Sequence, residues 1–232
     1  GGTAASNTDG TITSSVSANP TAGFSIVSYT GDGTDGATVG HGLSSAPELI
    51  IQKRLDLSWS WGVFDETIGA TKYLYLNSDI AAGTHSGFWN DTAPSASVFT
   101  IAAFHTNVDT STNIAYCFHS VEGYSKIGSY VGNEDADGTF IYTGFKPAYT
   151  LIKAADDGED WYAGDNKMNP YNVLGYMIQV NKPNAEDTSS DVNVDYVSNG
   201  FKLRTVEGRI NGANTYIYMA FAETPFKTAN AR

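Results

Sequence analysis

The feature that most constrains this chain is an internal repeat with a period of about 100 residues. Residues 47–53 (PELIIQK) align with residues 147–153 (PAYTLIK), and the same offset of 100 places Trp61 opposite Trp161. Further matches follow in the same order at offsets of 101 to 103, namely residues 28–31 with 129–132, 99–101 with 201–203, and 114–118 with 217–221. This period is longer than that of solenoid repeats. The repeat therefore predicts two related domains or half-domains.

The repeat also sets the expected domain boundaries. Residues 24–127 are predicted to form the first β repeat and residues 128–232 the second. Residues 1–23 are interpreted as a linker or N-terminal extension, because their first ten residues have neither the charged nor the apolar region of a signal peptide. Because Trp61 and Trp161 hold the same place in both copies, we expect them to occupy equivalent buried positions.

The local pattern within each copy is that of β-strands. Short runs rich in aromatic and β-branched residues are separated by Gly, Asn, Asp and Pro, as at residues 73–76, 99–104, 114–118, 191–197 and 216–221. No window predicts a helix longer than a turn or two. We therefore expect an all-β chain of two antiparallel β-sandwich, jelly-roll-like repeats, or one pseudo-symmetric sandwich built from both. The sequence leaves this choice open.

The charge balance limits the possible partners. Charged residues make up only 16% of the chain, and the formal net charge is −12. An acidic surface repels polyanions, so nucleic-acid binding is not expected. No apolar run reaches the roughly 18 residues that a membrane span needs, so membrane insertion is not expected either.

The histidines, the serines and the single cysteine form no recognisable motif for catalysis or metal binding. The four histidines, none of which belongs to an HExxH motif, are His41, His85, His105 and His119. A zinc site needs three or four converging ligands, which these histidines alone do not supply. No serine lies in a G-x-S-x-G nucleophile elbow. Cys117 lies in an apolar run, so we interpret it as a buried, unreactive thiol. We predict no catalytic residue, no metal, no cofactor and no enzymatic activity.

Two acidic clusters allow a second interpretation. Residues 134–138 (EDADG) and 156–160 (DDGED) have the composition of solvated turns. Carboxylate and carbonyl oxygens could also bind Ca²⁺, although neither cluster has the twelve-residue loop with a closing Glu. We interpret both clusters as turns, and calcium remains the alternative.

Aromatic residues that occur in one copy only are the candidates for a binding surface. Trp59 and the segment that holds Trp89, Asn90 and Asp91 have no counterpart in the second copy. Aromatic faces can stack on the apolar side of a sugar ring, while Asn and Asp fix its hydroxyl groups. We predict that these four residues form a ligand-binding surface. A core position is the alternative for both tryptophans.

Several longer motifs resemble a known family. They are GHGL at residues 40–43, APELII at 46–51, GATKYL at 69–74, FWNDTAP at 88–94, AYCF at 115–118, VEGYSK at 121–126, YTGFKPA at 142–148, SNGFKLR at 198–204 and MAFAE at 219–223. With them, the chain from about Thr21 to Arg232 resembles the C-terminal domain of tail-fibre-like, or other virion appendage, proteins of marine phages and cyanophages. Such domains often follow a concanavalin-like lectin domain. One departure is Phe118-His119-Ser120, where the resemblance would place Phe-Ala-Glu.

The resemblance implies a structural or adhesive role in a phage virion, with host attachment through surface polysaccharide. It also implies contact with other virion proteins and assembly into a homo-oligomer, by analogy a homotrimer. It brings no catalytic residues. The alternative is a carbohydrate-active enzyme or a free lectin on the same β-sandwich scaffold, and an enzyme of that kind needs two carboxylates converging at roughly 5–10 Å.

Overall fold

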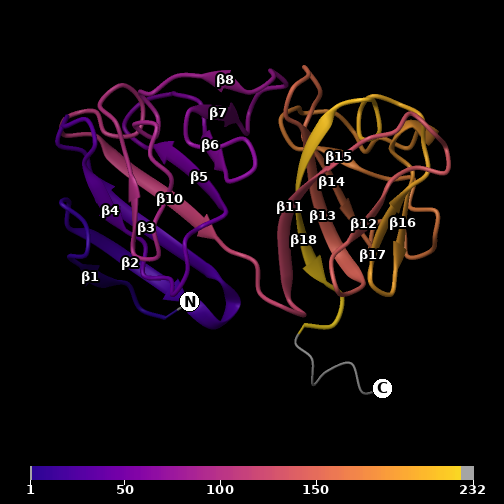
Figure 1. Ribbon diagram of the computed structural model, residues 1–232, viewed down its shortest axis with the longest axis horizontal. Coiled ribbons are helices and arrows are strands. Elements are labelled where there is room, and N and C mark those ends of the chain that lie inside the picture. Colours follow the sequence, from indigo (N-terminus) through magenta and orange to yellow (C-terminus); the bar gives the residue numbers. More distant parts are fainter. Residues whose placement is uncertain (1, 226–232) are drawn as a thin grey trace. The chain divides into compact units, whose positions relative to one another are not determined.

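The computed structural model describes residues 2–225, which fold into antiparallel β-sheets and two single-turn 3₁₀ helices, Pro20–Ala22 and Ser190–Val192. The chain divides into two compact units (Figure 1). Unit 1 comprises the residues up to Leu76 together with Ala82–His119. Unit 2 comprises Asn77–Ala81 and the residues from Ser120 onward.

Unit 1 is built on an eight-stranded sheet. Its strands, in spatial order, are β1 (Ala5–Asn7), β2 (Ser14–Asn19), β3 (Phe24–Thr30), β10 (Thr112–Phe118), β5 (Leu49–Arg54), β6 (Gly62–Asp65), β7 (Lys72–Tyr75) and β8 (Gly83–Thr84). A second, two-stranded sheet pairs β4 (Thr38–Gly40) with β9 (Val98–Thr100). Buried side chains of both sheets, such as Val27 on β3 and Phe99 on β9, meet in one core.

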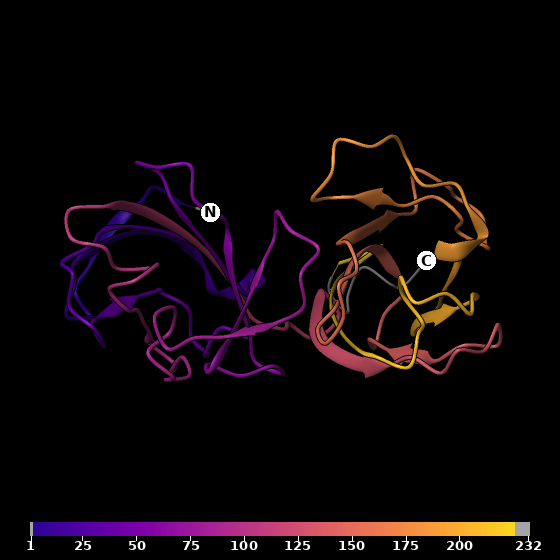
Figure 2. The ribbon, with the colours of Figure 1, turned by 90° about the horizontal axis from the view of Figure 1, so that it is seen from above.

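Unit 2 is a β-sandwich of two sheets. The larger sheet has the order β11 (Ser125–Val131), β18 (Thr215–Ala222), β13 (Pro147–Ala154), β14 (Tyr162–Asp165) and β15 (Ile178–Gln179). The smaller sheet has the order β12 (Phe140–Tyr142), β17 (Gly200–Leu203) and β16 (Val194–Val197). Seen from above, the strands of unit 2 surround a common interior (Figure 2).

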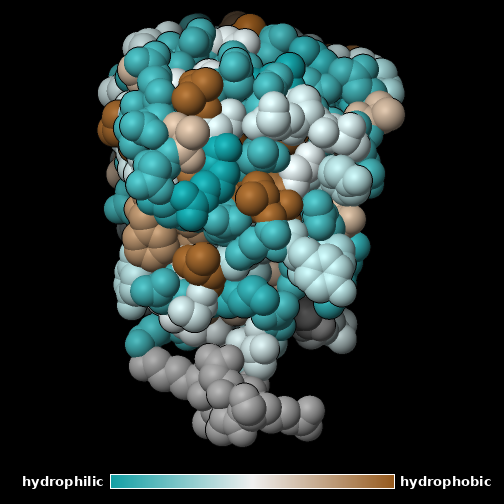
Figure 3. All heavy atoms as spheres, turned by 90° about the vertical axis from the view of Figure 1, so that its right-hand side faces the viewer, coloured by the Kyte–Doolittle hydropathy of each residue, from teal (hydrophilic) through white to brown (hydrophobic). Residues whose placement is uncertain are grey.

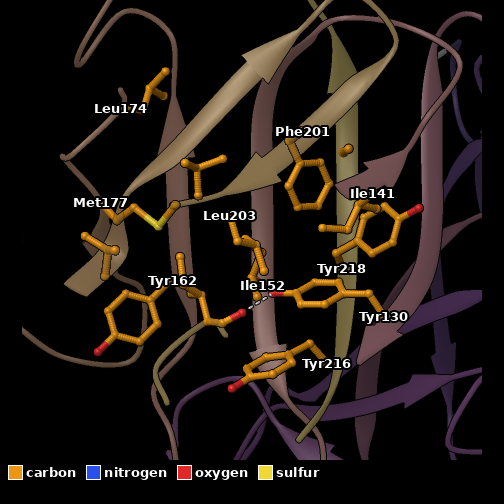
Figure 4. Packing of buried hydrophobic residues seen from close by; sticks show 14 of the residues in the cluster. Tyr130, Ile141, Ile152, Tyr162, Leu174, Met177, Phe201, Leu203, Tyr216 and Tyr218 are labelled. Atoms are coloured by element: carbon orange, nitrogen blue, oxygen red, sulfur yellow. Dashed lines mark hydrogen bonds between the residues drawn. The ribbon is translucent and has the colours of Figure 1, made fainter. Parts of the chain in front are cut away.

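The core of unit 2 is rich in tyrosine. Tyr130 and Tyr216 stack at 4.9 Å between ring centroids, and the ring of Tyr130 lies 6.2 Å from that of Phe201, which comes from the opposite sheet (Figure 4). The hydroxyl group of Tyr130 donates to the backbone carbonyl of Ile210 at 2.7 Å. A buried tyrosine needs such a partner, since an unpaired hydroxyl group inside a core costs about 1–3 kcal/mol.

The two units share one strand order. The run β3-β10-β5-β6-β7 in unit 1 has the same sequence order and antiparallel pairing as β11-β18-β13-β14-β15 in unit 2. The register agrees as well, because Phe118 lies opposite Leu49 and Phe221 lies opposite Tyr149. The repeat offsets of 100 and 103 place these residue pairs at matching positions.

The all-β prediction is confirmed. Each unit has its own core, so the described chain contains two separate cores and not one pseudo-symmetric sandwich. The expected equivalence of the two tryptophans holds only in part, because Trp161 is buried whereas Trp61 is half-buried and lies over Tyr116.

The linker prediction for residues 1–23 is wrong over most of its length. Strands β1 and β2 extend the main sheet of unit 1, and β2 pairs with β3 along five residues. The predicted boundary between residues 127 and 128 is also wrong, because it would divide β11. Along the chain, the last segment of unit 1 ends at His119 and the main segment of unit 2 begins at Ser120.

A buried asparagine anchors the loop after the first repeated strand in each unit. The carboxamide nitrogen of Asn107 donates to Asp32 Oδ1 and to the carbonyl of Thr34, both at 2.7 Å. Its Oδ1 accepts the backbone N–H of Asp32 at 2.9 Å. These bonds fix the loop that follows β3 and so hold one end of unit 1 in a defined shape.

Candidate functional site

Three aromatic side chains of unit 1 form an exposed group, called the aromatic patch below: Trp59, His85 and Phe104. Trp59 is 36% exposed and Phe104 is 51% exposed. The ring of Phe104 lies 5.8 Å from that of Trp59, edge to face, and 4.6 Å from that of His85, nearly parallel. The patch therefore presents ring surfaces to solvent.

Loops from three parts of unit 1 bring the patch together. Trp59 lies in the loop between β5 and β6, His85 directly follows β8, and Phe104 lies between β9 and β10. His85 Nδ1 accepts the backbone N–H of Gly87 at 2.8 Å, which fixes the ring. A Cβ atom on residue 87 would lie 2.6 Å from Phe104 Cβ and 2.7 Å from the His85 ring. Only glycine therefore lets these two rings stack so closely.

His105 supports the patch from beneath. Its ring is 1% exposed, stacks on Phe88 at 4.3 Å and lies 5.3 Å from Trp59. Within residues 2–225 neither ring nitrogen has a hydrogen-bond partner. Burial, together with the nearby charges of Lys53 and Arg54, lowers the pKa of His105 to about 4. The imidazole is therefore neutral at physiological pH and acts as an aromatic spacer.

Polar groups border the patch. The guanidinium carbon of Arg54 lies 5.8 Å from the centroid of the Trp59 ring. Two parallel bonds of 2.8 Å join Arg54 to Asp56, and they hold the pKa of Asp56 below its usual range. Arg54 is buried and Asp56 is exposed, so this bidentate pair fixes the Asp56 carboxylate where it can accept hydrogen bonds beside the tryptophan.

Of the four predicted site residues, only Trp59 belongs to the patch. Trp89 is 1% exposed and packs edge to face on Phe64, so its ring is not available for stacking on a ligand. Trp89 therefore occupies a core position, the alternative to a place in the binding surface. Asn90 is half-buried and Asp91 exposed, and both lie in the following turn with positive φ angles of 49° and 50°.

Two residues of the patch, His85 and Phe104, are not among those that the sequence predicts. The apolar run at residues 99–104 predicts that Phe104 lies in a strand, but β9 ends at Thr100 and the rest is a turn-rich segment. Its place in unit 2, counted from the match of Asn107 with Asn211, is held by Gly208. Phe104 is thus an aromatic residue that occurs in one copy only. The criterion that selected Trp59 therefore also identifies Phe104.

In the acidic cluster at residues 156–160, carboxylates accept hydrogen bonds from neighbouring groups of the chain. The carboxylate of Asp156 accepts the N–H of Thr215 at 3.0 Å, and that of Asp160 accepts bonds from Gln179, Asn181 and Lys182. Among residues 2–225 no group of three or more His, Cys, Asp or Glu side chains could hold a metal ion. Cys117 is buried, and burial raises the pKa of its thiol to about 12.

The outer surface of unit 2 differs from the patch. On the face in Figure 3, hydrophobic residues form separate spots within a mainly hydrophilic surface. Single exposed apolar residues of this kind are common on soluble domains and need no ligand to explain them. The stacked rings of unit 1 are therefore the better candidate for recognition.

Comparison with known proteins identifies the family of this chain. No helix in the described part of the chain is long and apolar enough to cross a membrane. No curated protein and no solved structure matches the chain. A family match covers residues 1–225. The chain belongs to the family described as Domain of unknown function (DUF7483).

Proposed function

We propose that this chain is a non-catalytic adhesive module that binds neutral carbohydrate through the aromatic patch of unit 1. The observation that carries the proposal is the exposed group in which Phe104 packs edge to face on Trp59 and stacks on His85. Rings of this kind can stack on the C–H face of a pyranose. Asp56, the more exposed member of its pair with Arg54, supplies acceptors for hydroxyl groups at the edge of the same surface.

The charge of the chain favours an uncharged ligand. The net charge is −12, so an acidic polysaccharide would be repelled over the whole surface. A shallow surface also implies weak binding at each site. Linked copies compensate for weak sites, because the second binding event occurs at a high effective concentration.

The sequence resemblance supports a place in a phage virion. We infer that the module belongs to a tail fibre or another virion appendage, where it contacts other virion proteins and forms a homo-oligomer, by analogy a homotrimer. Several copies side by side would give the multivalent attachment to host-surface polysaccharide that a shallow site requires.

We further infer that the two units arose by duplication. The matching strand order and register support this origin, as does the paired use of Asn107 and Asn211. The aromatic patch belongs to unit 1 alone, so the two copies have diverged in function. Unit 2 lacks the aromatic patch, and we infer that it serves the assembly of the homo-oligomer.

A glycan screen tests the proposed function. A panel of immobilised neutral and acidic polysaccharides is probed with the wild-type chain, with Trp59→Ala and with Tyr171→Ala, a control at an exposed tyrosine of unit 2. We expect binding to one or more neutral polysaccharides that Trp59→Ala weakens by about 10-fold, the order expected from the loss of one stacking contact. Equal binding by all three proteins, or binding to acidic polysaccharides only, would refute the proposal.

A further inference from the structure

Unit 2 contains an open groove at the beginning of β11. Its volume is about 470 Å³, within the range of ligand sites. The residues that line it, here called the β11 groove, are Ser120, Glu122, Gly123, Ser125, Lys126, Tyr142, Thr143 and Gly144. Tyr142, at the end of β12, is 65% exposed.

The corresponding place in unit 1 is filled by the chain itself. Strand β4 pairs with β9 as β12 pairs with β17, so Gly40 matches Tyr142 and Gly42 matches Gly144. The hydroxyl group of Ser14 donates to the carbonyl of Gly40 at 3.0 Å. A Cβ atom on residue 42 would lie only 2.9 Å from the side chain of Val16. Strand β2 therefore covers this part of unit 1.

Unit 2 has no strand equivalent to β2. In unit 1, β2 pairs with β3, but the matching strand β11 is the edge of its sheet among residues 2–225 (Figure 1). Only the six residues 119–124 separate β10 from β11. Six residues that must also connect the two strands cannot add a further paired strand. The open groove is thus a consequence of chain length.

The chain itself bonds the outer edge of β11 at Ser125, Ile127 and Val131, and Ser129 is the position between them where a strand can be added. Successive residues of an edge strand direct their N–H and C=O groups alternately to the two sides. Ser125 exchanges backbone bonds with Val121, and the N–H of Ile127 bonds to Ser120 Oγ, so the odd-numbered residues face away from β18. Ser129 is the next residue on this side and is exposed. It matches Ser28, which lies opposite Ser15 of β2.

We propose that the β11 groove and the edge of β11 bind an extended polypeptide strand of a partner chain, with small hydroxyl and β-branched side chains. The chemistry of this strand follows from the occupant of the same place in unit 1, residues 11–19 with the sequence TITSSVSAN. The receiving strands are alike, because β3 and β11 share Ile, Ser and Tyr at the positions of Ile127, Ser129 and Tyr130. Addition of a strand to a sheet edge is a common mode of peptide recognition.

The lining of the groove supports a strand of no net charge. Glu122 and Lys126 bring one charge of each sign, so the groove does not favour an ionic ligand. An exposed strand-edge position at Ser129, next to a groove that can take side chains, matches a polypeptide better than a sugar ring. This inference does not depend on the aromatic patch, which belongs to the other unit.

A labelled peptide with the sequence of residues 11–19 tests the proposal with the full chain. Fluorescence anisotropy should show saturable binding. Ser129→Pro removes the outward N–H and should weaken binding by about 10-fold or more, the order expected for a strand that loses ladder bonds. Ser129→Thr retains the N–H and should bind within about 2-fold of the wild type.

Hydrogen exchange of the wild-type chain gives a readout that does not depend on the folding of any variant. The amide of Ser129 should become protected when the peptide binds. Absence of saturable binding would overturn the proposal. So would protection confined to β3, which would mean that the peptide replaces β2, or displacement of the peptide by a neutral polysaccharide, which would make the groove a sugar site.

Discussion

The carboxamide nitrogen of Asn211 lies 3.0 Å from Asn133 Oδ1, and this contact in unit 2 repeats the one that Asn107 makes with Asp32 in unit 1. Asn107 and Asn211 are both fully buried. Asn211 Nδ2 also donates to the carbonyls of Asp135 and Thr205, at 2.9 and 2.6 Å. One side chain thus joins the loop that follows β11 to the segment that follows β17.

Replacement of either asparagine by alanine should therefore destabilise its own unit. Asn107→Ala leaves the N–H of Asp32 and the carbonyl of Thr34 without these partners, which should cost about 2–4 kcal/mol in the free energy of unfolding. Calorimetry together with hydrogen exchange should show the loss in unit 1 for Asn107→Ala and in unit 2 for Asn211→Ala. Asn184→Ala, at an exposed asparagine, is the control. Equal effects of all three changes would contradict this assignment.

His105 should make unit 1 sensitive to acid. Its pKa is lowered from 6.5 to about 4 in the folded chain, so the unfolded chain binds a proton between these values that the folded chain does not. Stability is therefore lost as the pH falls from 6.5 to 4, by on the order of 3 kcal/mol. His105→Phe retains the stacking on Phe88 and should not show this loss. Urea unfolding of both proteins between pH 8 and pH 4 measures the difference, and parallel curves would contradict it.

Asp65 should have the opposite dependence. Burial raises its pKa from 3.8 to about 7, so the folded chain holds the proton more tightly than the unfolded chain. Stability from this group is present at low pH and is lost as the pH rises from about 4 to about 7. Asp65→Asn keeps an acceptor for the N–H of Thr67 and should be more stable than the wild type at pH 8. Asp165→Asn, in the matching turn of unit 2, controls for the change of net charge. A destabilised Asp65→Asn chain at pH 8 would refute the assignment.

Gly87→Ala should weaken carbohydrate binding from outside the ligand site. The added methyl group would force apart the rings of Phe104 and His85, which stack at 4.6 Å. We expect about 3- to 10-fold weaker binding at an unchanged unfolding transition of unit 2. Titration calorimetry with a neutral polysaccharide from the screen measures the effect. Unaltered affinity would show that the ring arrangement is not what the ligand contacts.

The sequence predicts the fold class well but not the extent of unit 1. Alternation and turn residues are local properties, and they identify strands such as β10 and β18 directly. Residues 14–19 (SSVSAN) have the small polar composition of a linker, so only their pairing with β3 in three dimensions makes them a strand. The pairing of β2 with β3 is a tertiary contact, and amino-acid composition alone does not predict such contacts.

The candidate site was predicted in part for a similar reason. Trp59 and Trp89 meet the same sequence criterion, since each is an aromatic residue of one copy only. Whether such a ring faces solvent depends on what packs over it, and Trp89 is covered on the side of Phe64 and Phe88. Phe104 ends an apolar run, and such a run predicts a strand. In the structure the strand stops at Thr100, and the turn that follows brings Phe104 to the surface.

The most direct test of the account is a map of the residues that a neutral polysaccharide contacts. Assigned NMR spectra of the wild-type chain would be recorded with increasing amounts of a short oligosaccharide from the glycan screen. We predict that the largest shift changes occur at the indole N–H of Trp59 and at the ring signals of Phe104 and His85, while Trp161 in the core of unit 2 stays unchanged. Shift changes centred on unit 2, or none at saturating oligosaccharide, would contradict the proposal that the aromatic patch is the binding surface.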